Sequence, residues 1–96
     1  MNLDNNIKLQ IAKIADCYSY IEKIILFGSR ARKDNWPKSD IDLAVYSSEH
    51  LFEFIYDLET KTDTLLEFDV TCMNSSLDEE FIEQIEVEGK CIYEKH

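Results

Sequence analysis

The chain has 96 residues, of which 45% are hydrophobic, and its formal net charge is −10. This length predicts a single domain over residues 1–96 with one modest core, and the hydrophobic share excludes an intrinsically disordered chain. An acidic surface repels the phosphate backbone of nucleic acids and the surface of an anionic membrane. We therefore expect neither as a direct partner.

The cysteines and the N-terminus bear on the cellular compartment. Three cysteines are widely spaced and none forms a CxxC pair, which favours a reducing environment over a disulfide framework. We interpret Cys72 and Cys91 as small buried side chains. The N-terminal stretch is polar, unlike a secretory signal, and no apolar run approaches the ~20 residues that span a bilayer. The sequence therefore predicts a cytoplasmic protein.

The first half of the chain predicts two helices around one strand. Apolar residues recur at spacings of three and four over residues 3–20, which indicates an amphipathic helix. Residues 22–27, which end in the continuous apolar run 24–27, are typical of a central strand covered on both faces. Gly28 ends this run, and we expect a short helix over 29–35. A loop that contains the only proline follows at 35–38.

The second half predicts two more strands and a helix between them. Residues 41–46 and 66–72 alternate between apolar and polar side chains, as in strands with two different faces. A helix is expected over 49–60, with Ser48 as its N-cap.

The C-terminal part predicts one more helix and an edge strand. Ser76 and Glu79 resemble a capping box at the start of the last helix, which we expect to end at Gly89. Residues 91–93 would then form a short edge strand. The order of elements predicts an α+β fold, in which helices flank a small β-sheet.

Two aspartates stand out in the strand at 41–46. Side chains alternate along a strand, so Asp40 and Asp42 project from the same face. Two such carboxylates repel each other unless a cation lies between them, and Mg²⁺ prefers hard oxygen ligands. If the next strand is a neighbour, Asp69 joins the cluster, and three carboxylates could hold two cations. Taken alone, the pattern fits a solvated sheet face at least as well.

The Gly-Ser dipeptide before these aspartates is the second unusual feature. Gly28 ends a buried strand and leads into a helix N-terminus, where free amides favour a phosphate and glycine permits its close approach. The Ser29 hydroxyl can add a hydrogen bond, and Arg30 and Arg32 lie just beyond it. A simple turn and a solvated helix face explain each part by itself. The combination of a phosphate cradle with paired carboxylates favours a nucleotide site.

The stretch "LFGSRARKDNWPKSDIDLAV", followed by "LLEFDVTCM", resembles the DNA polymerase β-like nucleotidyltransferase superfamily, specifically its minimal nucleotidyltransferases. Their signature is a strand, Gly-Ser, a short helix with arginine, a strand with Asp-x-Asp and a later strand with a third aspartate. The tail "IEVEGKCIYE" also resembles this group, so the resemblance covers nearly the whole chain. The matching motif positions are Gly28, Ser29, Arg30, Ala31, Arg32, Ser39, Asp40, Asp42 and Leu43.

The resemblance implies the polymerase β-like fold, with a small mixed sheet, and ATP and Mg²⁺ as ligands. It implies that Gly28 and Ser29 bind the β- and γ-phosphates and that Asp40 and Asp42 hold two Mg²⁺ ions. Asp69 would ligate the catalytic ion and help to activate the attacking hydroxyl. Glu67 shares the face of Asp69 and is its rival. The nucleotide-binding positions further include Arg30, Arg32 and Ser39.

The resemblance also implies a protein partner. Minimal members are one half of a two-gene pair whose other half is a helical HEPN-family toxin. The nucleotidyltransferase is the antitoxin, and it transfers AMP from ATP to a tyrosine of the toxin, blocking the toxin's RNase activity. A hetero-oligomer of the two proteins is then an expectation. Two alternatives stay open: an antitoxin that neutralises its partner by binding alone, and nucleotidyl transfer to a small molecule such as an aminoglycoside.

Overall fold

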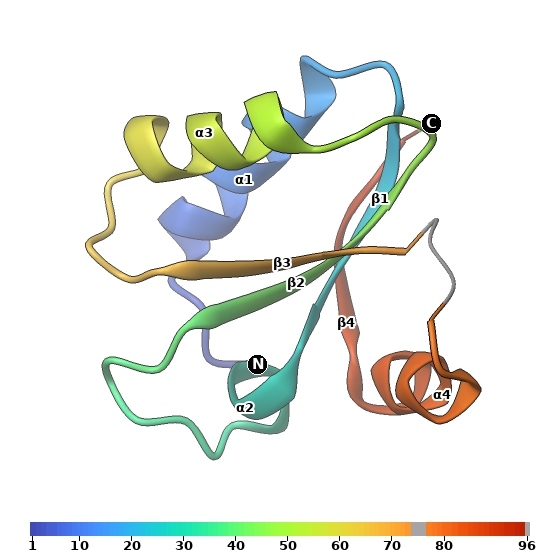
Figure 1. The fold of residues 1–96 in the computed structure, drawn as a ribbon. Coiled ribbons are helices and arrows are strands. Elements are labelled where there is room, and N and C mark those ends of the chain that lie inside the picture. Colours follow the sequence, from blue (N-terminus) through green and yellow to red (C-terminus); the bar gives the residue numbers. More distant parts are fainter. Residues whose placement is uncertain (74–76, 96) are drawn as a thin grey trace.

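The computed structural model describes residues 1–73 and 77–95. Helices and strands alternate along the chain, and Figure 1 shows them around one sheet. The elements are α1 (Asn5–Asp16), β1 (Ile21–Phe27), α2 (Gly28–Arg32), β2 (Ile41–Ser47), α3 (Phe52–Lys61), β3 (Phe68–Cys72), α4 (Glu79–Glu88) and β4 (Lys90–Glu94).

The four strands form one mixed sheet in the order β3-β2-β1-β4. The central pair β1 and β2 is antiparallel, β4 joins β1 antiparallel at one edge, and β3 joins β2 in parallel at the other. The register places Phe27 opposite Asp42, and Asp42 beside Asp69. The predicted α+β class, the mixed sheet and the C-terminal edge strand are therefore confirmed.

The sheet has a different cover on each face. In Figure 1, α1 and α3 lie together on one face, where side chains such as Ile11 and Phe54 form the main core with alternate residues of β1 and β2. Helix α4 packs on the other face, where Ile85 contacts Ile25 and Ala44. Strand β1 therefore contributes to both cores, which explains its unbroken apolar run.

The first helix is shorter than the periodicity predicts. Asp4 caps it, because its carboxylate accepts hydrogen bonds from the amides of Asn6 at 2.8 Å and Ile7 at 3.4 Å. The helix ends at Asp16, and the chain then turns toward β1. Tyr18 keeps its place in the apolar pattern because it packs against the main core from this turn rather than from a helix. The predicted range 3–20 was too long for this reason.

Other predicted boundaries also shift. Helix α2 begins at Gly28 and ends at Arg32 instead of Asn35, because Lys33 adopts a left-handed conformation with φ 69°. Ser48 does not cap α3, because the helix starts later and Leu51 occupies its N-cap position. Helix α3 begins at Phe52 and has no side-chain cap.

At the last helix, Asp78 is the N-cap and its carboxylate accepts from the amide of Glu80 at 3.0 Å. The expected cap, Ser76, lies outside the described residues. Gly89 ends the helix as predicted.

The cysteine interpretation is partly wrong. Cys72 packs against the main core but is only half-buried, and Cys91 is exposed because it lies on the outer strand β4. Within residues 1–73 and 77–95, no helix is both long enough and apolar enough to cross a membrane.

Candidate functional site

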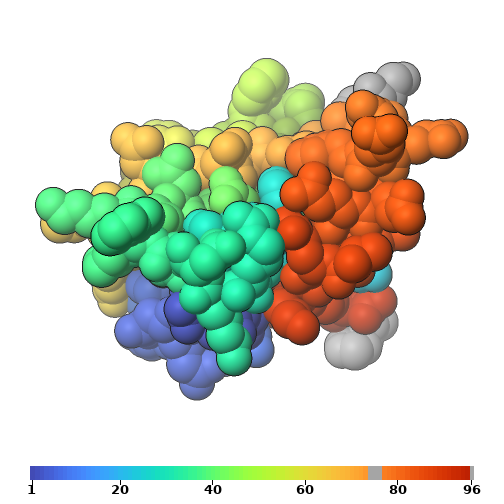
Figure 2. Space-filling view, turned by 90° about the horizontal axis from the view of Figure 1, so that it is seen from below, coloured from blue at the N-terminus to red at the C-terminus, as the bar shows by residue number. Residues whose placement is uncertain are grey.

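The fold brings the three predicted aspartates to one end of the sheet. Asp42 in β2 lies directly beside Asp69 in the parallel strand β3, and Asp40 immediately precedes β2. Asp42 is half-buried, whereas Asp40 and Asp69 are exposed. Figure 2 shows this side of the molecule: the teal and green surface of α2 and the following loop lies next to the orange surface of α4.

The pairing of strands places Asp69, rather than its rival Glu67, beside Asp42. Glu67 precedes β3, and its carbonyl accepts the amide of Ile41 at 2.9 Å. Asp69 is the residue in register with Asp42, and its charge raises the pKa of that carboxyl. Asp69 is therefore the third member of the cluster.

Electrostatics at Asp42 are unfavourable for a charged group. Burial raises the pKa of this carboxyl most, followed by the charges of Asp69 and Asp40, while Arg32 and Arg30 counteract them. Among the described residues, no cation forms an ion pair with Asp42. The cluster holds excess negative charge that a bound cation would offset.

These carboxylates fit a Mg²⁺ site that is completed by substrate. Within the described parts of the chain, no group of three acidic, histidine or cysteine side chains is close enough to hold a metal by itself. Mg²⁺ is usually bound by one or two carboxylates together with water and substrate phosphates. Asp42 and its neighbours supply hard oxygen donors on one face, and the remaining ligands would come with a nucleotide.

Gly28 touches this cluster directly. It has φ 74°, in the left-handed region, and a Cβ built on it would lie 2.4 Å from Oδ2 of Asp42. This contact follows from the register, since Phe27 is opposite Asp42 and Gly28 comes next. Only glycine combines this conformation with such a close approach. The Gly-Ser turn and the carboxylates, which are separate features of the sequence, therefore form one site.

Glu88, which lies outside the Gly-Ser and Asp-x-Asp motifs, also contacts the site. Its Oε1 accepts hydrogen bonds from the amide of Gly28 at 3.2 Å and from Nη1 of Arg32 at 3.1 Å. Arg32 further donates from Nε to Asp34 at 3.0 Å. The hydrogen bonds of Arg32 to Asp34 and to Glu88 raise the pKa of its guanidinium, which therefore stays charged. The only sequence signal for Glu88 is the Glu-Gly pair in the C-terminal tail.

Arg30 and Ser39 build the loop before Asp40. The Arg30 side chain is buried, and it donates to the carbonyl oxygens of Ser39 at 2.8 Å, Asn2 at 3.0 Å and Pro37 at 3.2 Å. The Ser39 hydroxyl accepts from the amide of Trp36 at 2.9 Å. Both residues were expected to contact nucleotide; their hydrogen bonds in the structure go to the protein itself, and contact with nucleotide stays a prediction.

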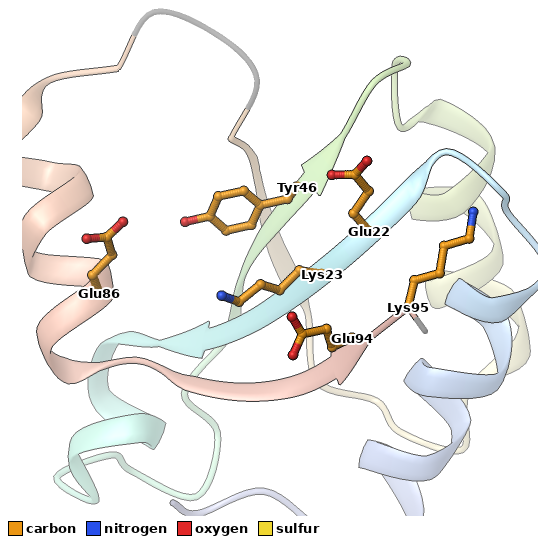
Figure 3. A pocket seen from close by; sticks show the side chains of 6 residues that line it. All are labelled: Glu22, Lys23, Tyr46, Glu86, Glu94 and Lys95. Atoms are coloured by element: carbon orange, nitrogen blue, oxygen red, sulfur yellow. The ribbon is translucent and has the colours of Figure 1, made fainter.

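Two hollows near the sheet differ in their relation to this site. A cavity of about 440 Å³ lies beside Asp40, between Lys38 and the residues Leu65 to Glu67. A second cavity, of about 530 Å³, lies elsewhere on the α4 side of the sheet, where Lys23 stands over the Tyr46 ring at 5.6 Å (Figure 3). Three glutamates, two lysines and Tyr46 line the second cavity, which includes neither the Gly28 turn nor any of the three aspartates.

Solved structures with the same fold include toxin–antitoxin complexes. A toxin–antitoxin structure with AMP-PNP has a TM-score of 0.71 and 23% identity, covering 98% of this chain and 76% of that one. The complex of a tri-AMPylated HEPN toxin from Shewanella oneidensis with its MNT antitoxin has a TM-score of 0.65 and 23% identity, covering 93% and 71%. An MntA-HepT toxin–antitoxin structure has a TM-score of 0.68 and 22% identity, covering 96% and 74%.

The family assignment rests on the sequence. No curated protein matches the chain. The family model described as "Polymerase beta, Nucleotidyltransferase" matches residues 9–96, which include the Gly-Ser turn and all three aspartates. The chain therefore belongs to the polymerase beta nucleotidyltransferase family.

Proposed function

We propose that this chain transfers AMP from ATP to a hydroxyl, expected to be that of a tyrosine, on a HEPN-family toxin and thereby acts as its antitoxin. The observation that carries this proposal is the contact of the Gly28 turn with Asp42, which itself lies beside Asp69. A phosphate-binding turn and a carboxylate cluster meet at one point, as nucleotidyl transfer requires.

The chain's own groups have distinct tasks in this reaction. Gly28 and Ser29 would bind the β- and γ-phosphates, and Asp40, Asp42 and Asp69 would hold two Mg²⁺ ions. When bound, these ions would neutralise phosphate charge and place the reacting oxygens in line. Arg32 is exposed enough to reach an incoming phosphate, since its side chain is 41% exposed.

The transfer itself exchanges one phosphorus–oxygen bond for another. The acceptor oxygen attacks the α-phosphorus, and the bond to the oxygen that bridges the α- and β-phosphates breaks. The hydroxyl proton passes toward the exposed carboxylate of Asp69, and pyrophosphate leaves with the electron pair. Because the single amide of Gly28 donates to Glu88, the donors of Ser29 would stabilise the charge that develops on this leaving group, and Gly28 would allow its close approach.

Charge and fold relatives support a protein acceptor. The net charge of −10 suits a toxin with a basic, RNA-binding surface, because complementary charge favours association. Two structures with this fold are of a toxin–antitoxin with AMP-PNP and of an AMPylated HEPN toxin with its MNT antitoxin. They support ATP as the donor and a HEPN-family protein as the acceptor.

The proposal can be tested with labelled nucleotide. The purified chain is incubated with Mg²⁺, ATP and the helical protein encoded by the neighbouring gene. Label at the α-phosphate should move to that protein, whereas label at the γ-phosphate should leave as pyrophosphate. Asp42→Asn should abolish the transfer. Transfer of the γ-label, or α-transfer that survives Asp42→Asn, would rule out the proposed site.

A binding-only antitoxin remains the rival function, since an acidic surface could mask a basic toxin without chemistry. Cells that carry the toxin and the double variant Asp40→Asn/Asp42→Asn separate the two functions. Survival equal to wild type would favour binding alone. Transfer to an aminoglycoside would instead show as a labelled small molecule in a reaction without any partner protein.

A further inference from the structure

We propose that Glu88 is a positioning residue for the terminal phosphates of the nucleotide. From the end of α4, its carboxylate fixes both the Gly28 turn and the Arg32 guanidinium. This inference rests on the proposed function, and it assigns a task to a residue outside the Gly-Ser and Asp-x-Asp motifs. It also gives a role to the Glu-Gly pair at the end of α4, directly before the last strand.

The contacts of Glu88 join the two groups expected to meet phosphate. One carboxylate oxygen, Oε1, accepts from the Gly28 amide at 3.2 Å and from Nη1 of Arg32 at 3.1 Å. The Glu88 side chain is only 16% exposed. Hydrogen bonds to an ionised carboxylate are stronger than neutral ones, so this oxygen holds the turn and the guanidinium at a fixed distance from each other.

Arg32 keeps donors for a ligand while it is held in this way. A guanidinium has five N–H groups. The described contacts use Nε for Asp34 and one N–H of Nη1 for Glu88, so both N–H groups of Nη2 remain available. The contact with Glu88 therefore orients the Arg32 guanidinium and leaves hydrogen-bond donors for a phosphate.

The backbone at Glu88 is itself fixed by close packing. A Cβ on the next residue, Gly89, would lie 2.3 Å from Cγ2 of Ile25 and 2.3 Å from the carbonyl oxygen of Ile85. Glycine is thus needed for α4 to end directly against β1. Ile85 is fully buried one turn earlier. The packing of Ile85 and Gly89 therefore fixes the position of Glu88, and the hydrogen bonds of Glu88 fix the positions of Gly28 and Arg32.

The benefit of this arrangement is preorganisation. Gly28 adopts φ 74°, and a glycine turn has many alternative conformations of similar energy. A hydrogen bond from its amide to a fixed carboxylate selects one of them before the nucleotide arrives, which lowers the ordering cost of binding. The negative charge of Glu88 works in the opposite direction, because it repels phosphate. The inference is that orientation outweighs this repulsion.

Nucleotide affinity distinguishes positioning from a general structural role. Binding of ATP and AMP is measured with Mg²⁺ for wild type, Glu88→Ala and Glu88→Gln, with Glu83→Ala on the exposed side of the same helix as control. Glu88→Ala should weaken ATP binding about tenfold, as expected for the loss of one charge-assisted hydrogen bond, and leave AMP binding unchanged. Glu88→Gln, which keeps an acceptor oxygen, should recover most of the ATP affinity.

A second readout needs no nucleotide. The chain contains two glycines, so selective ¹⁵N-glycine labelling yields one amide resonance from each. In Glu88→Ala the Gly28 amide should exchange faster with solvent, while Gly89, whose amide donates to Ile85 at 2.8 Å, serves as the internal control.

Three outcomes would overturn the inference: unchanged or tighter ATP binding in Glu88→Ala, an equal loss for AMP, or an unchanged rate of solvent exchange at the Gly28 amide. Wild-type protein that binds no ATP would instead contradict the proposed function, and the Gly28 resonance would still test whether Glu88 holds the turn.

Discussion

Replacing Asp42 by asparagine should stabilise the folded protein at neutral pH while it abolishes transfer. Burial and the neighbouring carboxylates raise the pKa of Asp42 in the folded state, so the folded protein binds this proton more tightly than the unfolded chain does. The resulting stabilisation is full below the unfolded pKa of about 3.9 and is lost as the pH rises through the folded pKa. At neutral pH the charged carboxylate therefore lowers the free energy of unfolding.

The size of this effect follows from the sheet register. Asp42 and Asp69 lie on adjacent strands, about 5 Å apart, where two like charges repel by roughly 1–3 kcal/mol for an effective dielectric constant of 20–80. Asp69 is exposed, so solvent screening favours the lower end of this range. Asp42→Asn should thus raise the free energy of unfolding by about 1 kcal/mol, which raises Tm by roughly 4–8 °C for a domain of this size.

Thermal unfolding followed by circular dichroism measures this gain. Asp42→Asn is compared with wild type at pH 7 and at pH 3, in low and high salt. Glu83→Gln removes the same charge from the exposed surface of α4 and serves as the control. The gain should appear at pH 7, shrink in high salt and vanish at pH 3. A lower Tm for Asp42→Asn at pH 7, or a gain that the control reproduces in full, would refute the reasoning.

Three further substitutions test other contacts. Gly28→Ala should lower the free energy of unfolding by about 1–2 kcal/mol, since an L-residue at positive φ is strained and its Cβ would meet Asp42. Urea unfolding that shows no loss of stability would contradict this. Arg30→Lys should lower the free energy of unfolding by about 1–3 kcal/mol, because carbonyls such as that of Ser39 lose hydrogen-bond donors. An unchanged Tm would show that the loop does not need the guanidinium. Asp4→Ala should lower the free energy of unfolding by about 1 kcal/mol, because α1 loses its N-cap. Faster amide exchange should be confined to the first turn of α1, and the transfer of AMP should not change.

The site's main feature could be predicted because its parts lie close in the sequence. Gly28 and Asp42 are joined by one short helix and a loop, and both adjoin apolar strands whose pairing is strongly determined by burial. The position of Asp69 required only that the next strand be a neighbour in parallel register, which the structure supplies.

Arg30 and Arg32 could not be distinguished from the sequence. Both follow the Gly-Ser pair, but residues two apart on a helix point in nearly opposite directions. Arg30 consequently faces the loop and is buried, while Arg32 is exposed beside Glu88. Which of them faces inward depends on how α2 packs against the rest of the fold, and no local pattern records it.

Glu88 could not be predicted for a similar reason. It lies 60 residues from Gly28 in the sequence, and in its own helix it is one of many glutamates. Its place depends on the close packing of Gly89 against Ile25. Tyr18 shows the same limit for local structure, since its apolar contact continues the helical pattern although the helix has already ended.

Intact-mass spectrometry of the proposed HEPN-family partner tests the central claim most directly. After incubation with ATP, Mg²⁺ and the wild-type chain, the partner should gain the mass of AMP, located on a tyrosine by fragmentation. Asp42→Asn should give no gain although it is folded and at least as stable as wild type, which excludes unfolding as the cause. An unmodified partner with the wild-type chain, or equal modification by Asp42→Asn, would contradict the account.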